Sequence, residues 1–196
     1  MRYDGFCAMP ILRQFRAAPN LLTLARLFII PFLVLAVLDG HNALAFALFL
    51  LAGVSDGLDG LLARWLKQAT VLGLYLDPIA DKLLLSTLFL VLTHVGRVPE
   101  YVTIFVFSRD LGILLIASLL FFTNTLRDFP PSFLGKANTC IQILTLVVVL
   151  IDPLYAWPAM HVLRIWLLHA TAYCAIASAA QYAWIVMRRI QAPVPA

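Results

Sequence analysis

The sequence predicts an all-α, polytopic membrane protein, and three observations support this fold class. Of its 196 residues, 63% are hydrophobic and only 12% are charged, and the mean hydropathy is +0.95. The apolar residues form long continuous runs rather than the alternating pattern of membrane barrel strands. Each run is near or above the roughly 20 residues that a helix needs to cross the hydrocarbon core. We therefore expect a single membrane domain, residues 1–196, without a separate soluble domain.

Six apolar runs are expected to form transmembrane helices. In chain order they cover about residues 20–39, 43–65, 71–95, 101–123, 135–157 and 162–187. Glycine, proline and charged residues separate them, in the stretches LDGHN, KQAT, GRVPE, TLRDFPPS and YAWPAMH. Before the first run, MPILRQFRAA alternates apolar and basic groups, so residues 1–19 are expected to contain a short interfacial helix. The alternative is a cleaved signal peptide, whose order of regions this segment does not follow.

Lysine and arginine are distributed unevenly between the two sides of the predicted bundle. Ten fall on the side of the termini and of the second and fourth connections: Arg2, Arg13, Arg16, Arg26, Arg64, Lys67, Arg127, Lys136, Arg188 and Arg189. Only Arg97 and Arg164 fall on the other side. Short cytoplasmic loops retain positive charge. We therefore expect the protein to lie in the inner membrane with both termini in the cytoplasm. The net charge of +4 then indicates topology and attraction to anionic membrane lipids, and no nucleic-acid partner.

Four aspartates interrupt the second and third runs: Asp56, Asp59, Asp77 and Asp81. An aspartate in or beside hydrocarbon costs on the order of 2.5 to 3.5 kcal/mol, so four of them require a compensating ligand. Helical spacing places two of them on one face of each helix, together with Gly60, Ala63 and Arg64 on the second helix and Gly73 on the third. Antiparallel helices joined by a short turn would direct all four carboxylates into one cleft at the cytoplasmic edge.

The chemistry of these four groups favours a metal site. Four carboxylates so close together would repel one another unless divalent cations lay between them. Oxygen ligands without histidine or cysteine select a hard ion, Mg²⁺ or Mn²⁺. Two such ions bridged by shared carboxylates would form a clamp for phosphate oxygens, as in many phosphoryl-transfer sites. A cation carrier or channel is the alternative of another class, but its acids would be spread through several helices near the midplane.

The motif Asp56-x-x-Asp59-Gly60-x-x-Ala63-Arg64, followed after eight residues by Gly73-x-x-x-Asp77-x-x-x-Asp81, resembles the signature of the CDP-alcohol phosphotransferases at every fixed position. The resemblance extends over most of the chain and implies six membrane helices, with the signature on the second and third. It further implies an enzyme of phospholipid biosynthesis. Such an enzyme transfers a phosphatidyl group from CDP-diacylglycerol to an alcohol and releases CMP.

The same resemblance implies roles for individual residues. Asp56, Asp59 and Asp77 would bind two Mg²⁺ or Mn²⁺ ions, and Asp81 would contact the second ion and act as the catalytic base. The donor nucleotide and its phosphates would be held at five positions: Asn20, Thr23, Gly60, Arg64 and Thr70. Asn20 and Thr23 have an alternative interpretation, since either could simply cap the start of the first helix.

The acceptor is predicted less directly. Arg109 in the fourth run and Lys136 at the start of the fifth are candidates to bind an acceptor phosphate. The alternative is that Arg109 and Asp110 form a structural ion pair with Asp59 or Lys82, Arg109 with the acid or Asp110 with the lysine. PNLLTLARLFIIPF and LDPIADK resemble the phosphatidylglycerophosphate synthases of the family, which makes glycerol 3-phosphate the expected acceptor. The alternative acceptor is phosphatidylglycerol, because PSFLGKANTCIQI resembles the cardiolipin synthases, and because FSRDLGILL has Asp110 where the phosphatidylglycerophosphate synthases usually have glutamate. Small residues in AIASAAQYA would also permit a homodimer contact.

Overall fold

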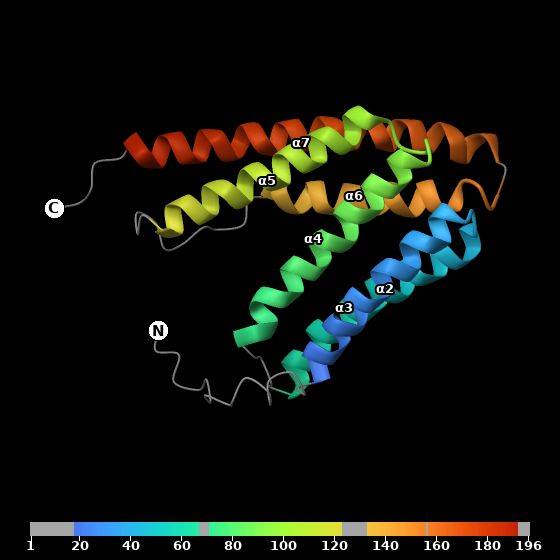
Figure 1. The fold of residues 1–196 in the computed structure, drawn as a ribbon. Coiled ribbons are helices and arrows are strands. Elements are labelled where there is room, and N and C mark those ends of the chain that lie inside the picture. The colour runs from blue at the N-terminus through green and yellow to red at the C-terminus, as the bar shows by residue number, and fades with distance from the viewer. Residues whose placement is uncertain (1–17, 67–70, 123–132, 156, 192–196) are drawn as a thin grey trace. The chain divides into compact units, whose positions relative to one another are not determined.

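The computed structural model describes the backbone of residues 18–66, 71–122, 133–155 and 157–191. It describes the side chains of residues 23–55, 79–113, 115, 134–155, 157–185, 187 and 188. Within these ranges every regular element is a helix (Figure 1). The helices are α2 (Ala18–Leu38), α3 (Asn42–Leu66), α4 (Val71–His94), α5 (Glu100–Phe122), α6 (Phe133–Ile151) and α7 (Pro158–Gln191). The all-α prediction is confirmed for the described chain, and the expected interfacial helix lies mostly outside it.

The largest difference from the expected elements lies between the last two helices. The sequence pattern suggested a fifth helix to about residue 157, but α6 ends at Ile151 and α7 begins at Pro158. Pro153 explains the early end, because a proline disfavours the helical conformation of the residue before it, here Asp152. Pro158 explains the new start, because a proline is well tolerated at the first helical position, where no backbone donor is required.

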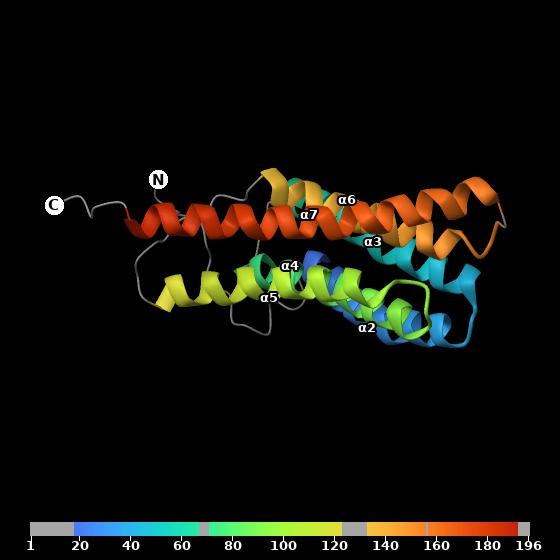
Figure 2. The same cartoon turned by 90° about the horizontal axis from the view of Figure 1, so that it is seen from above.

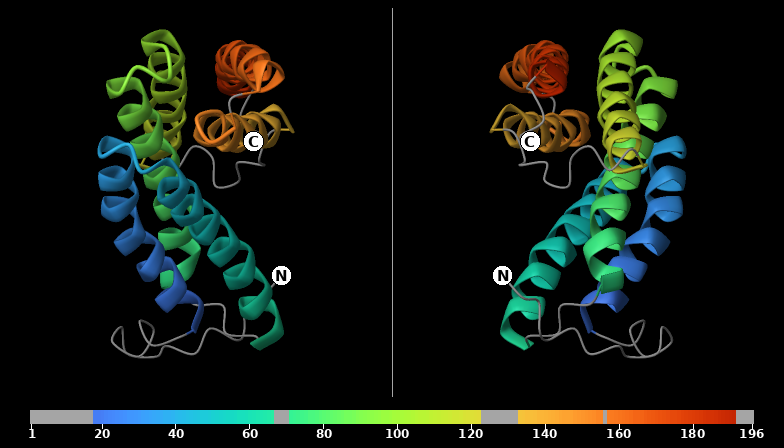
Figure 3. Two further views of the ribbon diagram at one scale, coloured as in Figure 1. Left: turned by 90° about the vertical axis from the view of Figure 1, so that its right-hand side faces the viewer. Right: turned by 90° about the vertical axis from the view of Figure 1, so that its left-hand side faces the viewer.

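The chain divides into two compact units within α4, the first ending at Val91 and the second beginning at Leu92. In the first unit α2 packs against α3 as its antiparallel neighbour (Figures 1 and 3). Gly40 makes the turn between them with a φ of 74°. The His41 N–H donates to the Ala36 carbonyl at 2.9 Å and the Gly40 N–H donates to the Val37 carbonyl at 3.2 Å. This glycine-dependent helix cap explains the LDGHN interruption.

In the second unit α7 packs against both α5 and α6 (Figure 2). Tyr101 of α5 is hydrogen-bonded to His169 of α7, and further along the same pair Arg109 donates to Ser178. Because the contacts advance in the same direction along both helices, α5 and α7 run parallel. Thr145 of α6 and Thr171 of α7 exchange a hydrogen bond of 2.7 Å between their buried hydroxyls. Polar side chains therefore join all three helices of this unit.

The distribution of polar and apolar side chains is typical of helices that face lipid. Large apolar groups lie outside, among them Phe28, Trp166 and Tyr173, which are 73%, 71% and 72% exposed. Polar side chains such as Thr145 and Thr171, which are hydrogen-bonded to each other, are buried instead. Without water between helices, interhelical hydrogen bonds of this kind help to hold a membrane bundle together.

Two described helical stretches are long and apolar enough to cross a membrane, Leu134–Ile151 and Pro158–Ile185. Only 39% and 28% of these stretches are buried, whereas the core helix of a soluble protein would be mostly buried. Shorter apolar stretches occur at Thr23–Leu38 and Asn42–Ser55. Two spans are thus supported within the described residues, and the six-span arrangement stays a prediction.

Candidate active site

The signature residues lie on two consecutive helices of the first unit. Asp56 and Asp59 occupy the C-terminal half of α3, and Asp77 and Asp81 occupy the N-terminal half of α4. Of these four side chains, the structure describes that of Asp81. Gly60 and Arg64 lie on α3 with undescribed side chains, and Thr70 belongs to the connection outside the described residues. The common cleft for the four carboxylates therefore stays a prediction.

Asp81 forms an ion pair with Arg26 of α2. The Arg26 side chain is 0% exposed, whereas the Asp81 side chain is 42% exposed. Removing a guanidinium group from water is costly unless a carboxylate compensates its charge, so this contact determines where Arg26 can lie. Arg26 thereby restricts the position of the residue that the sequence predicts as the catalytic base.

The sequence pattern predicts Arg26 only as a topology-determining charge, and its contact with Asp81 is seen only in the structure. It belongs to α2, which packs against α3, while its guanidinium group reaches α4. The first helix therefore connects to both helices that carry the signature. A usable signal was present in the sequence, because an arginine inside the apolar run NLLTLARLFIIPF needs a buried partner.

The two donor-site residues expected on α2 lie before Arg26. Thr23 is completely buried. It lies three residues before Arg26 on α2, about one turn earlier on the same face of the helix. Asn20 lies in the first turn of α2, and its side chain is not described. Thr23 is thus a buried polar residue of the first unit, and its contact with a nucleotide stays a prediction.

The two predicted acceptor residues belong to the second unit and differ in exposure. Arg109 is 8% exposed and donates through Nε and Nη2 to the Ser178 hydroxyl at 3.3 and 3.1 Å. Its Nη1 donates to the Asp110 carboxylate at 2.5 Å. These contacts lie within one unit, whereas Asp59, the alternative partner of Arg109, and Lys82, the alternative partner of Asp110, belong to the other. Lys136 is exposed in the first turn of α6.

Two buried amides follow Lys136 on α6. Asn138 is 0% exposed, and neither its side-chain oxygen nor its nitrogen has a hydrogen-bond partner among the described residues. Gln142, one turn later, is 2% exposed, and its Nε2 also lacks such a partner there. An unsatisfied buried amide costs roughly 1 to 3 kcal/mol, so these groups indicate a place for water or a polar ligand.

Among the described side chains, no group of three or more histidine, cysteine or acidic residues is arranged to hold a metal ion. Three of the four signature aspartates are outside that set, so the finding does not bear on the predicted site. The donor chemistry does fit a hard divalent ion, because all four proposed ligands are carboxylates.

Comparison with known proteins gives a consistent result. The profile described as CDP-alcohol phosphatidyltransferase matches residues 16–187. A cardiolipin synthase (CMP-forming) of Rattus norvegicus is 33% identical over 182 residues, covering 84% of this chain and 59% of that protein. A probable phosphatidylglycerophosphate synthase of Mycobacterium tuberculosis is 36% identical over 129 residues, covering 63% of this chain and 60% of that protein. A putative cardiolipin synthase of the same species is 34% identical over 191 residues, covering 90% of this chain and 88% of that protein.

The chain thus spans about three fifths of the length of the first two relatives and most of the third. The family match includes the entire signature as well as Arg26, Arg109 and Lys136. Family members act on CDP-alcohol donors and alcohol acceptors and use a divalent metal ion. Because the match extends over so much of the sequence and the relatives agree with it, this chain belongs to the CDP-alcohol phosphatidyltransferase family.

Proposed function

We propose that the protein transfers a phosphatidyl group from CDP-diacylglycerol to a glycerol-type alcohol and releases CMP. The observation that supports this most is the complete signature on α3 and α4, within the family match, with Asp81 held by Arg26. The cation transporter considered as an alternative gives no reason for this spacing. Two acceptors are compatible with the chain, glycerol 3-phosphate and phosphatidylglycerol.

The choice between these acceptors draws on different observations. The motifs PNLLTLARLFIIPF and LDPIADK favour glycerol 3-phosphate. The relatives named as cardiolipin synthases align over 84% and 90% of the chain, against 63% for the phosphatidylglycerophosphate synthase, which favours phosphatidylglycerol. Asp110 stands where the phosphatidylglycerophosphate synthase pattern usually has glutamate, which also favours phosphatidylglycerol.

In the proposed mechanism, Asp56, Asp59, Asp77 and Asp81 would hold Mg²⁺ or Mn²⁺. When bound, such ions neutralise charge on the donor diphosphate. Arg26 keeps the Asp81 carboxylate in place. Asp81 then accepts the proton of the acceptor hydroxyl as its oxygen bonds to the phosphorus that bears diacylglycerol. The bond from that phosphorus to the CMP oxygen breaks, and CMP leaves with the electron pair.

A direct test uses purified protein with CDP-diacylglycerol and either glycerol 3-phosphate or phosphatidylglycerol, with CMP release and the lipid product measured together. We expect CMP release that depends on one of the two acceptors and yields the corresponding phospholipid. Absence of release with both acceptors, under conditions where the protein is folded and supplied with Mg²⁺ or Mn²⁺, would contradict the proposed reaction.

Arg26→Ala should lower kcat roughly 100-fold while changing the donor KM little. A misplacement of a catalytic group by about 1 Å can cost this much, and Arg26 contacts Asp81 directly. Steady-state kinetics on folded, monodisperse protein provides the measurement, with Arg26→Lys expected to retain part of the rate. If Arg26 acts through Asp81, the double variant Arg26→Ala with Asp81→Asn should be no slower than Asp81→Asn alone. Additive losses would show that Arg26 acts elsewhere.

Arg109→Ala should raise the acceptor KM roughly 10- to 100-fold and leave the donor KM nearly unchanged. A charge-assisted hydrogen bond contributes about 1.5 to 3 kcal/mol, and about 1.4 kcal/mol corresponds to a factor of ten. Ser178→Ala is the matched control, because it removes a described partner of Arg109 without removing the charge. An equal effect on both substrates, or loss of folded protein with Arg109→Ala but not with Ser178→Ala, would assign Arg109 a structural role instead.

We further propose a single membrane domain with six spans in the inner membrane, both termini and the active site facing the cytoplasm. In a variant without native cysteines, Ser132→Cys should react with an impermeant thiol reagent only from the cytoplasmic side, and Pro99→Cys only from outside. Intact cells and inverted vesicles supply the two sides. Reversed labelling would contradict the orientation. The possible homodimer stays a prediction, although Ala175 and Ser178 of its small-residue stretch are buried within the chain.

A further inference from the structure

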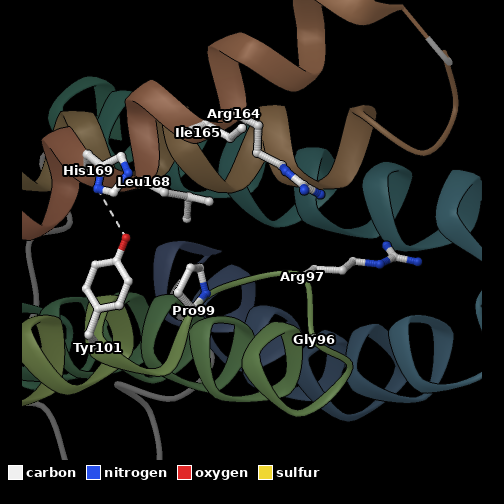
Figure 4. Close-up of a pocket in the computed structure, with 8 residues that line it drawn as sticks. All are labelled: Gly96, Arg97, Pro99, Tyr101, Arg164, Ile165, Leu168 and His169. Carbon is white, nitrogen blue, oxygen red and sulfur yellow. Dashed lines mark hydrogen bonds between the residues drawn. The ribbon is translucent and has the colours of Figure 1, made fainter.

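A pocket of about 200 Å³ lies in the second unit, between the α4–α5 connection and the first turns of α7 (Figure 4). Arg97 and Pro99 from the connection contribute to one wall, and Arg164 and Leu168 of α7 contribute to the other. Among the described residues, Asp81, Arg109 and Lys136 are not part of its lining. The lining of this pocket therefore calls for an explanation of its own.

The connection that carries Arg97 has a defined conformation. Gly96 adopts a φ of 73°, which side chains other than glycine rarely accommodate. The Gly96 N–H donates to the Thr93 carbonyl at 2.9 Å, and the Arg97 N–H donates to the Leu92 carbonyl at 2.8 Å. These two bonds close the C-terminal cap of α4. The backbone of Arg97 is therefore fixed directly beside the pocket.

Two guanidinium groups, those of Arg97 and Arg164, line this pocket, and the Asp152 carboxylate lies near them. Arg164 Nη1 lies 3.0 Å from Asp152 Oδ2, and His161 Nδ1 lies 3.6 Å from the same oxygen. Burial lowers the pKa of Arg97, the charge of Arg164 lowers it further, and Asp152 opposes both effects. The Asp152 carboxylate thus interacts electrostatically with the guanidinium groups of both Arg97 and Arg164. Glu100 is close along the chain, but it is exposed and is not part of the pocket wall.

An apolar pocket of about 380 Å³ adjoins the cationic one. Val162 and Trp166 line it, and both pockets share Ile165 and His169. Trp166 is 71% exposed, so this surface opens toward the surroundings of the bundle. At the boundary, Tyr101 Oη lies 3.1 Å from His169 Nδ1, and the two rings stack with their centroids 6.1 Å apart. A polar compartment and an apolar compartment therefore share part of their lining.

We propose that the two compartments bind one anionic phospholipid, with its phosphate beside Arg97 and Arg164 and an acyl chain along Val162, Ile165 and Trp166. The two guanidinium groups that line the polar compartment favour a phosphate group with net negative charge. The adjoining exposed apolar surface selects a phosphate that carries a hydrocarbon chain. In the predicted topology this site lies at the outer end of the helices, away from the signature. It is thus a lipid site in addition to the substrate site.

The test measures lipid retention and thermal stability of the purified full chain with phosphatidylserine, phosphatidylcholine or inorganic phosphate. Phosphatidylserine should be retained and should raise Tm, with weaker effects of phosphatidylcholine. Arg97→Gln and Arg164→Gln should each weaken phosphatidylserine binding roughly 10- to 100-fold. The control Arg188→Gln removes an exposed arginine that packs over Trp184, outside the pocket, and should bind normally. Arg97→Gln should also keep its CMP release, which separates this site from the active site.

Trp166→Ala distinguishes the two possible sources of the phosphate. It should weaken phosphatidylserine binding and leave inorganic phosphate binding unchanged, because it alters only the apolar compartment. Wild-type affinity for phosphatidylserine in Arg97→Gln would overturn the proposal. Equal stabilisation by inorganic phosphate, with no effect of Trp166→Ala, would overturn the lipid assignment. Should Arg164→Gln fail to fold because it loses the Asp152 ion pair, Arg97→Gln and Trp166→Ala still decide the outcome.

Discussion

Asp56→Ala and Asp77→Ala should each reduce phosphatidyl transfer by about 1,000-fold or more. Metal ions contribute several kcal/mol to reactions of this type, and each 1.4 kcal/mol or so corresponds to a factor of ten. Because these residues are the proposed link between metal and donor diphosphate, the variants should also lose donor binding. CMP release measures the first effect, and equilibrium binding of CDP-diacylglycerol measures the second.

The control for these variants is Asp39→Ala. Asp39 is an exposed carboxylate in the same unit, at the turn between α2 and α3, and it lies outside the signature. We expect this variant to keep the wild-type rate and donor affinity. A near-normal rate in Asp56→Ala or Asp77→Ala would show that the role implied by the signature is wrong at that position.

Chelation of divalent ions should abolish transfer, and excess Mg²⁺ or Mn²⁺ should restore it. The proposed ligands are all carboxylates, which prefer hard ions. Without a bound ion, the donor diphosphate would face these carboxylates with no cation to bind it. Rates are measured with EDTA alone and after titration with each ion, which also identifies the preferred metal. Full activity in excess EDTA would refute the metal assignment.

A second measurement separates metal binding from general effects of the chelator. Mg²⁺ or Mn²⁺ should raise the Tm of the wild-type protein, since a ligand that binds the folded state stabilises it by mass action. The increase should be smaller in Asp77→Ala and unchanged in Asp39→Ala. The same increase in all three proteins would indicate that the ion binds away from the signature.

Much of the fold followed from local properties of the sequence. Most of the described helices begin and end within a few residues of the boundaries of the apolar runs. Helix formation and membrane partition depend on neighbouring residues and on the length of the run, so the sequence can predict them. The interruptions LDGHN and GRVPE were recognised for the same reason, and their Gly40 and Gly96 adopt the positive φ expected of helix caps. The boundary between α6 and α7 was misplaced, although Pro153 was visible, because a long apolar stretch masked its effect.

The sequence by itself determined the all-α class, the spacing of the four aspartates and the family signature, since each depends on residue types at short fixed separations. Only the tertiary structure showed that Arg26 is buried against Asp81, that Arg109 is held by Ser178 and Asp110, and that Arg97 and Arg164 share a pocket. Arg26 and Asp81 are 55 residues apart along the chain, and Arg109 and Ser178 are 69 apart. Helical periodicity assigns each residue to a face of its own helix, but the partner it meets depends on how the helices pack.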